Sequence, residues 1–270
     1  MKPTLLLLFV LAGLCQKSAA INAPRYIGAK SWGMAGASVG NIDAFSGFNN
    51  QAAMAFLPKP TIGFYADNRF GIADLGAQAI AVAVPTKSAA LALNYQHYGT
   101  TGYNDQKIGF AVSKRFGPKI AFGVQLNYFS NRLIAQKTNS ISFELAMLAK
   151  LTEKTNLGVQ LFNPIQTLNA DPTNNFTRPT SIRAGITHQL SPKLILAAEV
   201  EKDLIYTPNA KFGIDYRPTE MFYIRGGIST NPQLNCIGMG FAFKSFVLDI
   251  ATSIHPVLRA SSHASISYRF

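Results

Sequence analysis

The strongest constraint on the fold is an alternation of large apolar residues with small or polar ones, which recurs from residue 61 to the C-terminus. It is clearest at 119–129, where every second residue is large and apolar: Ile120, Phe122, Val124, Leu126 and Tyr128. A period of two is that of a β-strand whose two faces differ. Repeated over segments of about ten residues, it is typical of transmembrane barrels. A soluble sandwich with inward apolar faces has the same period, so the alternation alone does not decide between them.

The composition favours the membrane alternative. Hydrophobic residues make up 48% of the chain and charged residues only 14%, whereas an average soluble domain has about 25% charged residues. Beyond the N-terminus, no stretch approaches the roughly 20 consecutive apolar residues of a membrane-spanning helix. Because only helices and closed barrels pair every backbone group in lipid, we predict an all-β fold, a transmembrane antiparallel β-barrel.

Residues 1–20 have the pattern of a cleaved signal peptide. A positively charged start precedes an apolar run at 5–14 that is too short to span a bilayer, and small residues end the segment. We therefore expect cleavage between Ala20 and Ile21. The exported chain would keep a single cysteine, Cys236, and so could form no intramolecular disulfide.

Residues 21–60 lack the alternation and are rich in Gly, Ala and Ser. The part from Asp43 to Leu57 could form one or two short helices, and prolines follow it directly. We expect this segment to lie as a plug or hatch in or under the barrel, which residues 61–270 would then form.

The alternation predicts about fourteen strands, or about twelve if the first pair belongs to the plug. Tight turns containing Pro, Gly or Ser alternate with connections that are mostly longer and more polar. In outer-membrane barrels the tight turns face the periplasm, so we expect both chain ends there. The expected strands are 61–69, 75–84, 88–99, 106–116, 119–130, 139–151, 155–163, 180–190, 193–204, 209–217, 221–230, 235–243, 246–254 and 262–270.

The last strand ends in aromatic residues. Ile266, Tyr268 and Phe270 share one face, and Phe270 is the final residue. Such a strand looks like the signal that the barrel-insertion machinery reads, although the final strand of a soluble sheet could have the same pattern. Together with the export signal it predicts the cell outer membrane as the location, with outer-membrane lipid and the insertion machinery as partners.

The net charge of +12 would first suggest a nucleic-acid partner. The basic residues are scattered singly, however, and many lie in predicted turns. Export would also separate the chain from cytoplasmic nucleic acid. We therefore expect no nucleic-acid binding, and contact instead with anionic head groups or an acidic partner.

Charged residues on the inward face of the predicted strands carry both signs, and many other inward positions are Gly or Ala. The charges could line a water-filled path, or they could pair with each other and with the N-terminal segment. The small residues leave room for a plug, which favours a plugged or narrow barrel. The inward charges are Glu144, Lys150, Arg183, Glu199, Glu201, Lys211, Asp215, Arg225, Asp249 and Arg269.

Histidine and serine residues near the C-terminus raise the possibility of a lipid hydrolase. Such an enzyme needs a third group to orient the histidine and an oxyanion hole, and no spacing here requires either of them. We therefore expect a non-enzymatic protein. The histidines and the cysteine also lack the spacing of metal ligands, and no cofactor is expected. The residues weighed are His255, His263, Ser261, Ser262 and Ser265, with Asp249 and Glu199 as candidate acids.

Part of the N-terminal segment resembles a known signature. The stretch GMAGASV at 33–39, an aspartate and then NNQAAM at 49–54 resemble the GMGGA…D…NPAGLA pattern of the FadL-like superfamily, closest to its PorV/PorQ members. Here Asn-Gln replaces the usual Asn-Pro, and the chain is shorter than typical members. The resemblance extends over the exported chain and implies a barrel with an N-terminal plug. The plug-motif residues are Gly33, Gly36, Asp43, Asn49 and Asn50.

Three functions follow as expectations. The resemblance implies first a PorV/PorQ-like accessory of type IX protein secretion, which acts through contact with other envelope or secretion proteins. The alternative is FadL-like transport of small hydrophobic molecules, which requires an apolar cavity near the N-terminal segment. The third, a lipid hydrolase, requires a serine within hydrogen-bond reach of a histidine.

Overall fold

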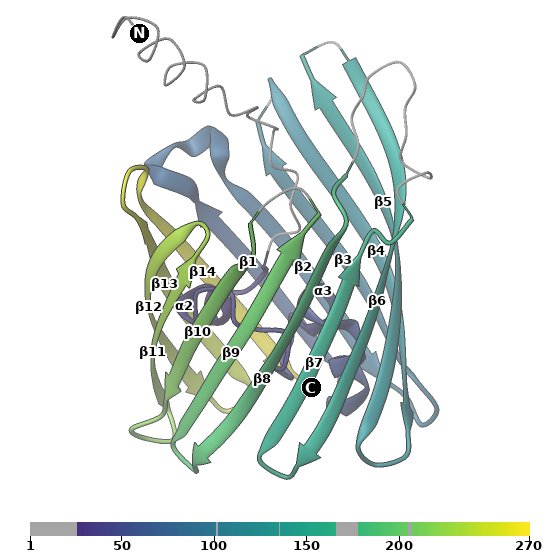
Figure 1. Ribbon diagram of the computed structural model, residues 1–270, viewed down its shortest axis with the longest axis vertical. Coiled ribbons are helices and arrows are strands. Elements are labelled where there is room, and N and C mark those ends of the chain that lie inside the picture. Colours follow the sequence, from purple (N-terminus) through teal and green to yellow (C-terminus); the bar gives the residue numbers. More distant parts are fainter. Residues whose placement is uncertain (1–25, 101, 135, 166–177, 205–206) are drawn as a thin grey trace, which may run out of the picture.

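The computed structural model describes residues 26–100, 102–134, 136–165, 178–204 and 207–270, so the predicted signal peptide with its cleavage site at Ala20 and Ile21 lies outside the described residues. The fold is a closed barrel of fourteen antiparallel strands, as predicted (Figure 1). The strands are β1 Thr61–Asn68, β2 Ala77–Pro85, β3 Ala90–Gly99, β4 Tyr103–Phe116, β5 Ile120–Leu133, β6 Gln136–Thr152, β7 Thr155–Phe162, β8 Ser181–Ser191, β9 Leu194–Asp203, β10 Asn209–Tyr216, β11 Phe222–Thr230, β12 Gln233–Phe243, β13 Phe246–His255 and β14 Arg259–Arg269.

Each strand pairs with its neighbours in the chain, and the first strand closes the barrel by pairing with the last. In that closing pair Thr61 lies opposite Arg269 and Asn68 opposite Ser262. Strands β1 and β2 both belong to the barrel wall, so the alternative prediction of about twelve strands is wrong. No helix among the described residues has the length and apolar character to cross a membrane.

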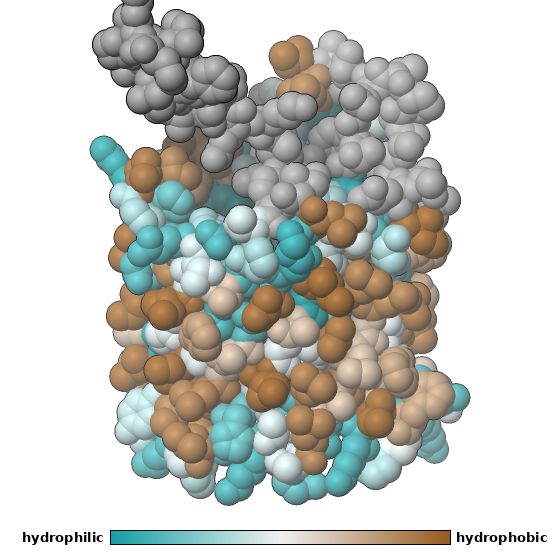
Figure 2. Space-filling model, viewed as in Figure 1, coloured by the Kyte–Doolittle hydropathy of each residue, from teal (hydrophilic) through white to brown (hydrophobic). Residues whose placement is uncertain are grey.

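The barrel is apolar on the outside and polar on the inside. On β5, Phe122 and Leu126 are 48% and 46% exposed, whereas Gln125 and Asn127 are fully buried. Hydrophobic residues accordingly cover most of the visible outer wall (Figure 2). A soluble sandwich would bury its large apolar side chains, so this inversion selects the membrane barrel.

The two ends of the barrel differ. One end, here called the tight-turn end, carries the first residue of β1 and the last of β14, and short connections such as 192–193 and 244–245. The opposite, loop end carries the connections at 69–76 and 163–180. The loop end also has tight connections, for example at 231–232, so the predicted alternation of short and long connections holds only in part.

Strands β4 to β6 extend farther toward the loop end than predicted, and in Figure 1 they rise above the rest of the wall. Tyr103 pairs with Leu133, and Asn131 with Thr138, beyond the point where the apolar alternation stops. Backbone hydrogen bonds can extend a strand beyond the lipid without any apolar alternation. The prediction relied on that alternation, so it ended these strands too early.

Residues 26–60, here called the plug, lie inside the barrel and contain helices α2 Ala29–Gly33 and α3 Ser46–Asn49 and the 3-10 helix η1 Gln51–Phe56 (Figure 1). The plug backbone packs directly against wall glycines. A side chain at Gly158 would overlap the Val39 carbonyl, and one at Gly227 would lie 2.5 Å from the Met34 carbonyl carbon. The small inward residues are therefore what gives the plug room.

Candidate functional site

The centre of the lumen contains a buried polar cluster around Glu144 of β6. Its carboxylate accepts hydrogen bonds from Lys107 Nζ at 2.7 Å and from the side-chain amide of Gln51 in the plug at 2.6 Å. Three wall amides complete its shell, Gln125, Asn127 and Gln160. A buried carboxylate needs such partners, because an unpaired charge in this position would be costly. Gln51, which departs from the family pattern, is thus a partner of the central acid.

A second cluster joins β8, β9 and β10 to the plug. Oε2 of Glu199 accepts from the backbone N–H groups of Ser38 and Val39, both at 2.9 Å. Its Oε1 accepts from Arg183 Nε at 2.7 Å and Lys211 Nζ at 2.9 Å. The wall therefore holds the plug backbone through hydrogen bonds to a buried carboxylate. Hydrogen bonds to an ionised acceptor are stronger than those between neutral groups.

Tyr26, the first described residue, closes this second cluster. Its hydroxyl donates to Glu201 and accepts from Lys211, which also pairs with Glu201. Burial, and then the Glu201 carboxylate, raise the pKa of the Tyr26 phenol well above its ordinary value. The phenol therefore remains a neutral donor to Glu201 at physiological pH.

A third cluster lies against the first helix of the plug. Arg225 of β11 bonds to Asp249 at 2.7 Å and lies 3.2 Å from Asp215, while Lys30 of the plug reaches Asp215 at 3.7 Å. In each of the three clusters the cations and carboxylates match one for one: Lys107 with Glu144, Arg183 and Lys211 with Glu199 and Glu201, Arg225 and Lys30 with Asp215 and Asp249. This charge balance is that of a closed lumen with internally paired charges.

The structure places the predicted inward charges as follows. Six are buried in these clusters, namely Glu144, Arg183, Glu199, Asp215, Arg225 and Asp249, as is Lys211. Glu201 is half-buried, and half-buried Lys150 lies with Nζ 4.5 Å from the centre of the Phe56 ring in the plug. Arg269 shares the inward phase but is exposed, because it lies at the tight-turn rim where the lumen ends.

Sequence reasoning missed Lys107 and the amides of Gln125 and Asn127. Lys107 is in phase with inward Gly109 and Ala111, so the alternation of β4 could have identified it. It lay near the expected start of the strand, where the pattern is weak.

The plug-motif residues shape the plug itself. Asn49 bonds to both backbone groups of Ile27, and Asn50 donates to the Val39 carbonyl at 2.6 Å while accepting from Ala52 N–H at 3.0 Å. Asp43 accepts from the Phe45 N–H at 2.9 Å. Gly36 has a φ of +82°, a value that other residues rarely adopt. Gly33 packs against Gly238 of the wall, where an added Cβ would lie 3.3 Å from the Gly238 Cα.

Above the plug, toward the loop end, the described residues line a partly open cavity of about 590 Å³, here called the loop-end cavity, whose lining includes Arg69, Glu201 and Asp203. Ligand pockets for small molecules have volumes of about 300–1,000 Å³ and mostly apolar walls with a few polar groups. The apolar side of this cavity is formed by Trp32, Phe70, Tyr98, Leu234 and Leu258.

A chain of hydrogen bonds borders this cavity. His263 Nε2 lies 2.9 Å from Ser253 Oγ, His263 Nδ1 lies 2.9 Å from the Tyr65 hydroxyl, and that hydroxyl donates to Asp67 at 2.9 Å. The imidazole also stacks on Trp32, with ring centroids 4.3 Å apart. The wall thereby fixes the aromatic residue that the plug contributes to the cavity.

His255, Ser261 and His263 line the loop-end cavity together, but the hydrogen bonds of the weighed serines and of His255 go to backbone groups and not to each other. Ser261 accepts from Phe70 N–H, Ser265 accepts from Ala29 N–H, and His255 accepts from the backbone of its own turn. Asp249 and Glu199 are bound to arginines elsewhere. The serine that does meet His263 is Ser253, which was not considered, and the histidine's other partner is a phenol. Within the described part of the chain, no three His, Cys, Asp or Glu side chains are grouped to hold a metal ion.

The aromatic residues of the final strand lie at the tight-turn rim. Ile266 and Phe270 are exposed on the outer face, and half-buried Tyr268 packs between the rings of Phe246 and Phe270 at centroid distances of 4.6 and 4.9 Å.

Known structures share this architecture, whereas no family model and no curated protein matches the sequence. The toluene transporter TbuX of Ralstonia pickettii aligns with a TM-score of 0.71 over 93% of this chain and 100% of its own, at 11% identity. A FadL homologue of Pseudomonas aeruginosa aligns at 0.66 over 90% and 98%, at 15% identity. The P. putida toluene transporter TodX aligns at 0.67 over 92% and 99%, at 12% identity. Likenesses at such low identity show the fold alone: this chain, a closed antiparallel β-barrel of fourteen strands with short helices near its N-terminus, has the same barrel fold as these proteins.

Proposed function

We propose that the protein binds small apolar molecules in the loop-end cavity and takes part in their passage across the outer membrane. The observation that carries the proposal is the cavity itself, about 590 Å³ with an aromatic wall to which the plug contributes Trp32. That volume suits a one- or two-ring hydrocarbon. Two of the proteins that share the fold are described as toluene transporters, which supports the same class of ligand.

The chain supplies its own reporter for this proposal. Trp32 is the only tryptophan in the sequence, and it lines the cavity. We expect toluene to change the intrinsic fluorescence of the purified protein in detergent along a saturable curve. No saturable change up to the solubility limit of toluene, with a folded protein, would contradict the proposal.

Two adjacent residues give a matched pair of variants. Leu258 lines the cavity, whereas its neighbour Val257 does not and is 81% exposed. Leu258→Asp would place a charge beside the apolar ligand, and we expect toluene affinity to fall by about tenfold or more. Val257→Asp should leave the affinity unchanged.

A second candidate is a PorV/PorQ-like accessory of type IX secretion that acts by contact with other envelope proteins. The sealed centre of the lumen favours it, because the Glu144 and Glu199 clusters hold the plug to the wall and leave paired charges where a channel would run. Such an accessory should co-purify with envelope partners after mild detergent extraction. An isolated monomer in native pulldowns would count against it.

In both cases the protein acts without catalysis. The hydrogen bonds of Ser253 and His263 then serve to hold the imidazole under Trp32, which orients the cavity wall. We also propose that the tight-turn end, with both chain ends, faces the periplasm. Short periplasmic turns are the usual arrangement in outer-membrane barrels.

A further inference from the structure

The connections at the tight-turn end are uniformly basic. Its six turns, read from the strand bounds, each contain one Lys or Arg and together contain two acids, Glu153 and Glu220. The cations are Lys87, Lys119, Lys154, Lys193, Arg217 and Lys244. The seven connections at the loop end contain only Arg69 and Arg178 against Asp74 and Asp171. Among the connections, positive charge is therefore concentrated at the tight-turn end.

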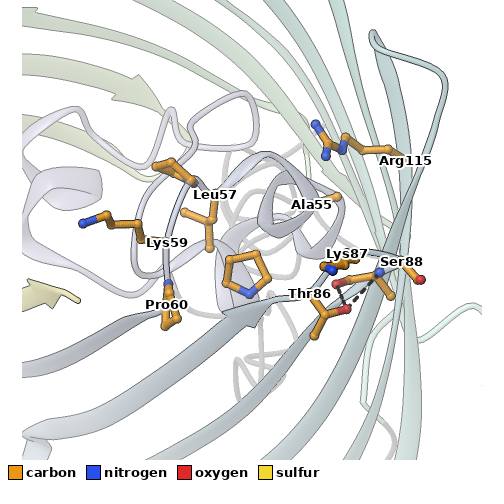
Figure 3. Close-up of a pocket in the computed structure, with 11 residues that line it drawn as sticks. Ala55, Leu57, Lys59, Pro60, Thr86, Lys87, Ser88 and Arg115 are labelled. Carbon is orange, nitrogen blue, oxygen red and sulfur yellow. Dashed lines mark hydrogen bonds between the residues drawn. The ribbon is translucent and has the colours of Figure 1, made fainter.

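A pocket of about 660 Å³ opens within this basic end, where the plug leaves the lumen (Figure 3). Lys59 comes from the exit of the plug, Lys87 from the β2–β3 turn and Arg115 from the end of β4. No acidic residue lines the pocket. Leu57, a buried residue of the plug, forms part of the wall, so a molecule in this pocket would touch the plug.

These three cations are available to a ligand. None of the ion pairs formed between described residues includes Lys59, Lys87 or Arg115, whereas the cations of the three lumen clusters are all paired. The Thr86 hydroxyl, which also lines the pocket, donates a hydrogen bond to the Ala89 carbonyl of its own turn and not to any of the three cations. Three cations that line one pocket without a carboxylate among its lining residues favour an anionic ligand.

The direction of the side chains distinguishes a protein partner from lipid head groups. Arg115 shares the inward phase of β4 with the buried residues Ala111 and Ser113, and Lys59, an exposed residue at the exit of the plug, lines the same pocket. A head group would meet the outer circumference of the barrel, where Lys114 lies in the outward phase. A flexible acidic segment can instead enter the mouth from the aqueous side.

We infer that the pocket formed by Lys59, Lys87 and Arg115 is a docking site for a carboxylate-rich peptide segment of a partner protein, which binds at the tight-turn mouth against the exit of the plug. This site goes beyond the binding of apolar molecules, because it lies at the opposite end of the barrel. Complementary charge of this kind accelerates association and selects acidic partners.

Fluorescence anisotropy of the full-length protein in neutral detergent tests this inference. The probe is a fluorescein-labelled peptide of alternating Gly and Glu, and the reference probe has Gln in place of Glu. We expect the Glu peptide to bind at low salt and the Gln peptide not to bind. Substitution of the pocket cations, as Lys59→Gln, Lys87→Gln and Arg115→Gln together, should weaken binding about tenfold or more.

A second triple variant keeps the same change in net charge but leaves the pocket intact: Lys154→Gln, Lys193→Gln and Lys244→Gln. It should retain most of the affinity. Equal losses of peptide affinity in the two variants would show that binding is spread over the basic rim and would contradict a specific site. Binding of the Gln peptide would also contradict it. So would a pocket variant that keeps its peptide affinity but loses association with anionic phosphatidylglycerol vesicles. Thermal unfolding in detergent shows that both variants are folded, and the toluene response of Trp32 separately tests the proposed function.

Discussion

The side-chain amide of Gln51 in the plug donates a hydrogen bond of 2.6 Å to Oε2 of Glu144 in strand β6, across a sequence separation of 93 residues. Both side chains are buried. The bond therefore joins the plug to the wall at the centre of the lumen, and a new charge in this position would have no water to stabilise it.

The variant Gln51→Glu tests this bond. It would place a second carboxylate against Glu144, which has Lys107 as its one cationic partner. We expect unfolding free energy to fall by about 3 kcal/mol or more, the usual cost of an uncompensated buried charge. Thermal unfolding in detergent measures it. Gln233→Glu, at an exposed position of the loop end, is the matched control and should change stability little.

Glu199→Gln should loosen the plug. The amide oxygen could replace only one of the carboxylate oxygens, and Arg183 and Lys211 would lose their shared counter-charge. We expect faster hydrogen exchange at the Ser38 and Val39 amides and transient ion conductance in planar bilayers. Glu220→Gln, in an exposed turn, should show neither change. A tight, non-conducting Glu199→Gln barrel would mean that other contacts hold the plug.

The strands of the barrel wall were largely predictable. Their outer face contacts lipid and their inner face carries small or polar residues, so apolar residues recur at every second position of the sequence. The pairing of charges inside the lumen was not predictable. Alternation placed Glu199 inward but gave no sign that its carboxylate would meet the backbone of Ser38 and Val39. That contact depends on the path of the plug, which has no period. The partner of His263 was missed for another reason: Ala251 lies directly opposite His263 on β13, and the diagonal neighbour Ser253 makes the hydrogen bond.

Ser253 should be unreactive toward a fluorophosphonate probe. An acyl-transfer serine needs an oriented histidine and an oxyanion hole, and here the imidazole is oriented by a phenol while its face is covered by Trp32. Mass spectrometry after labelling checks this. Covalent labelling of Ser253 that disappears in His263→Phe would show that the protein is an enzyme after all.

The proposed orientation of the barrel, with the tight-turn end in the periplasm, predicts opposite labelling of two engineered cysteines. Lys244 lies in a tight turn and Val257 in a connection at the loop end, and the native Cys236 is buried. In intact cells a membrane-impermeant maleimide should label Val257→Cys but not Lys244→Cys. Permeabilising the outer membrane should make the Lys244→Cys variant reactive, because the reagent then reaches the periplasm. The reverse pattern would place the basic tight-turn mouth at the cell surface, and any acidic partner of that mouth would have to be extracellular.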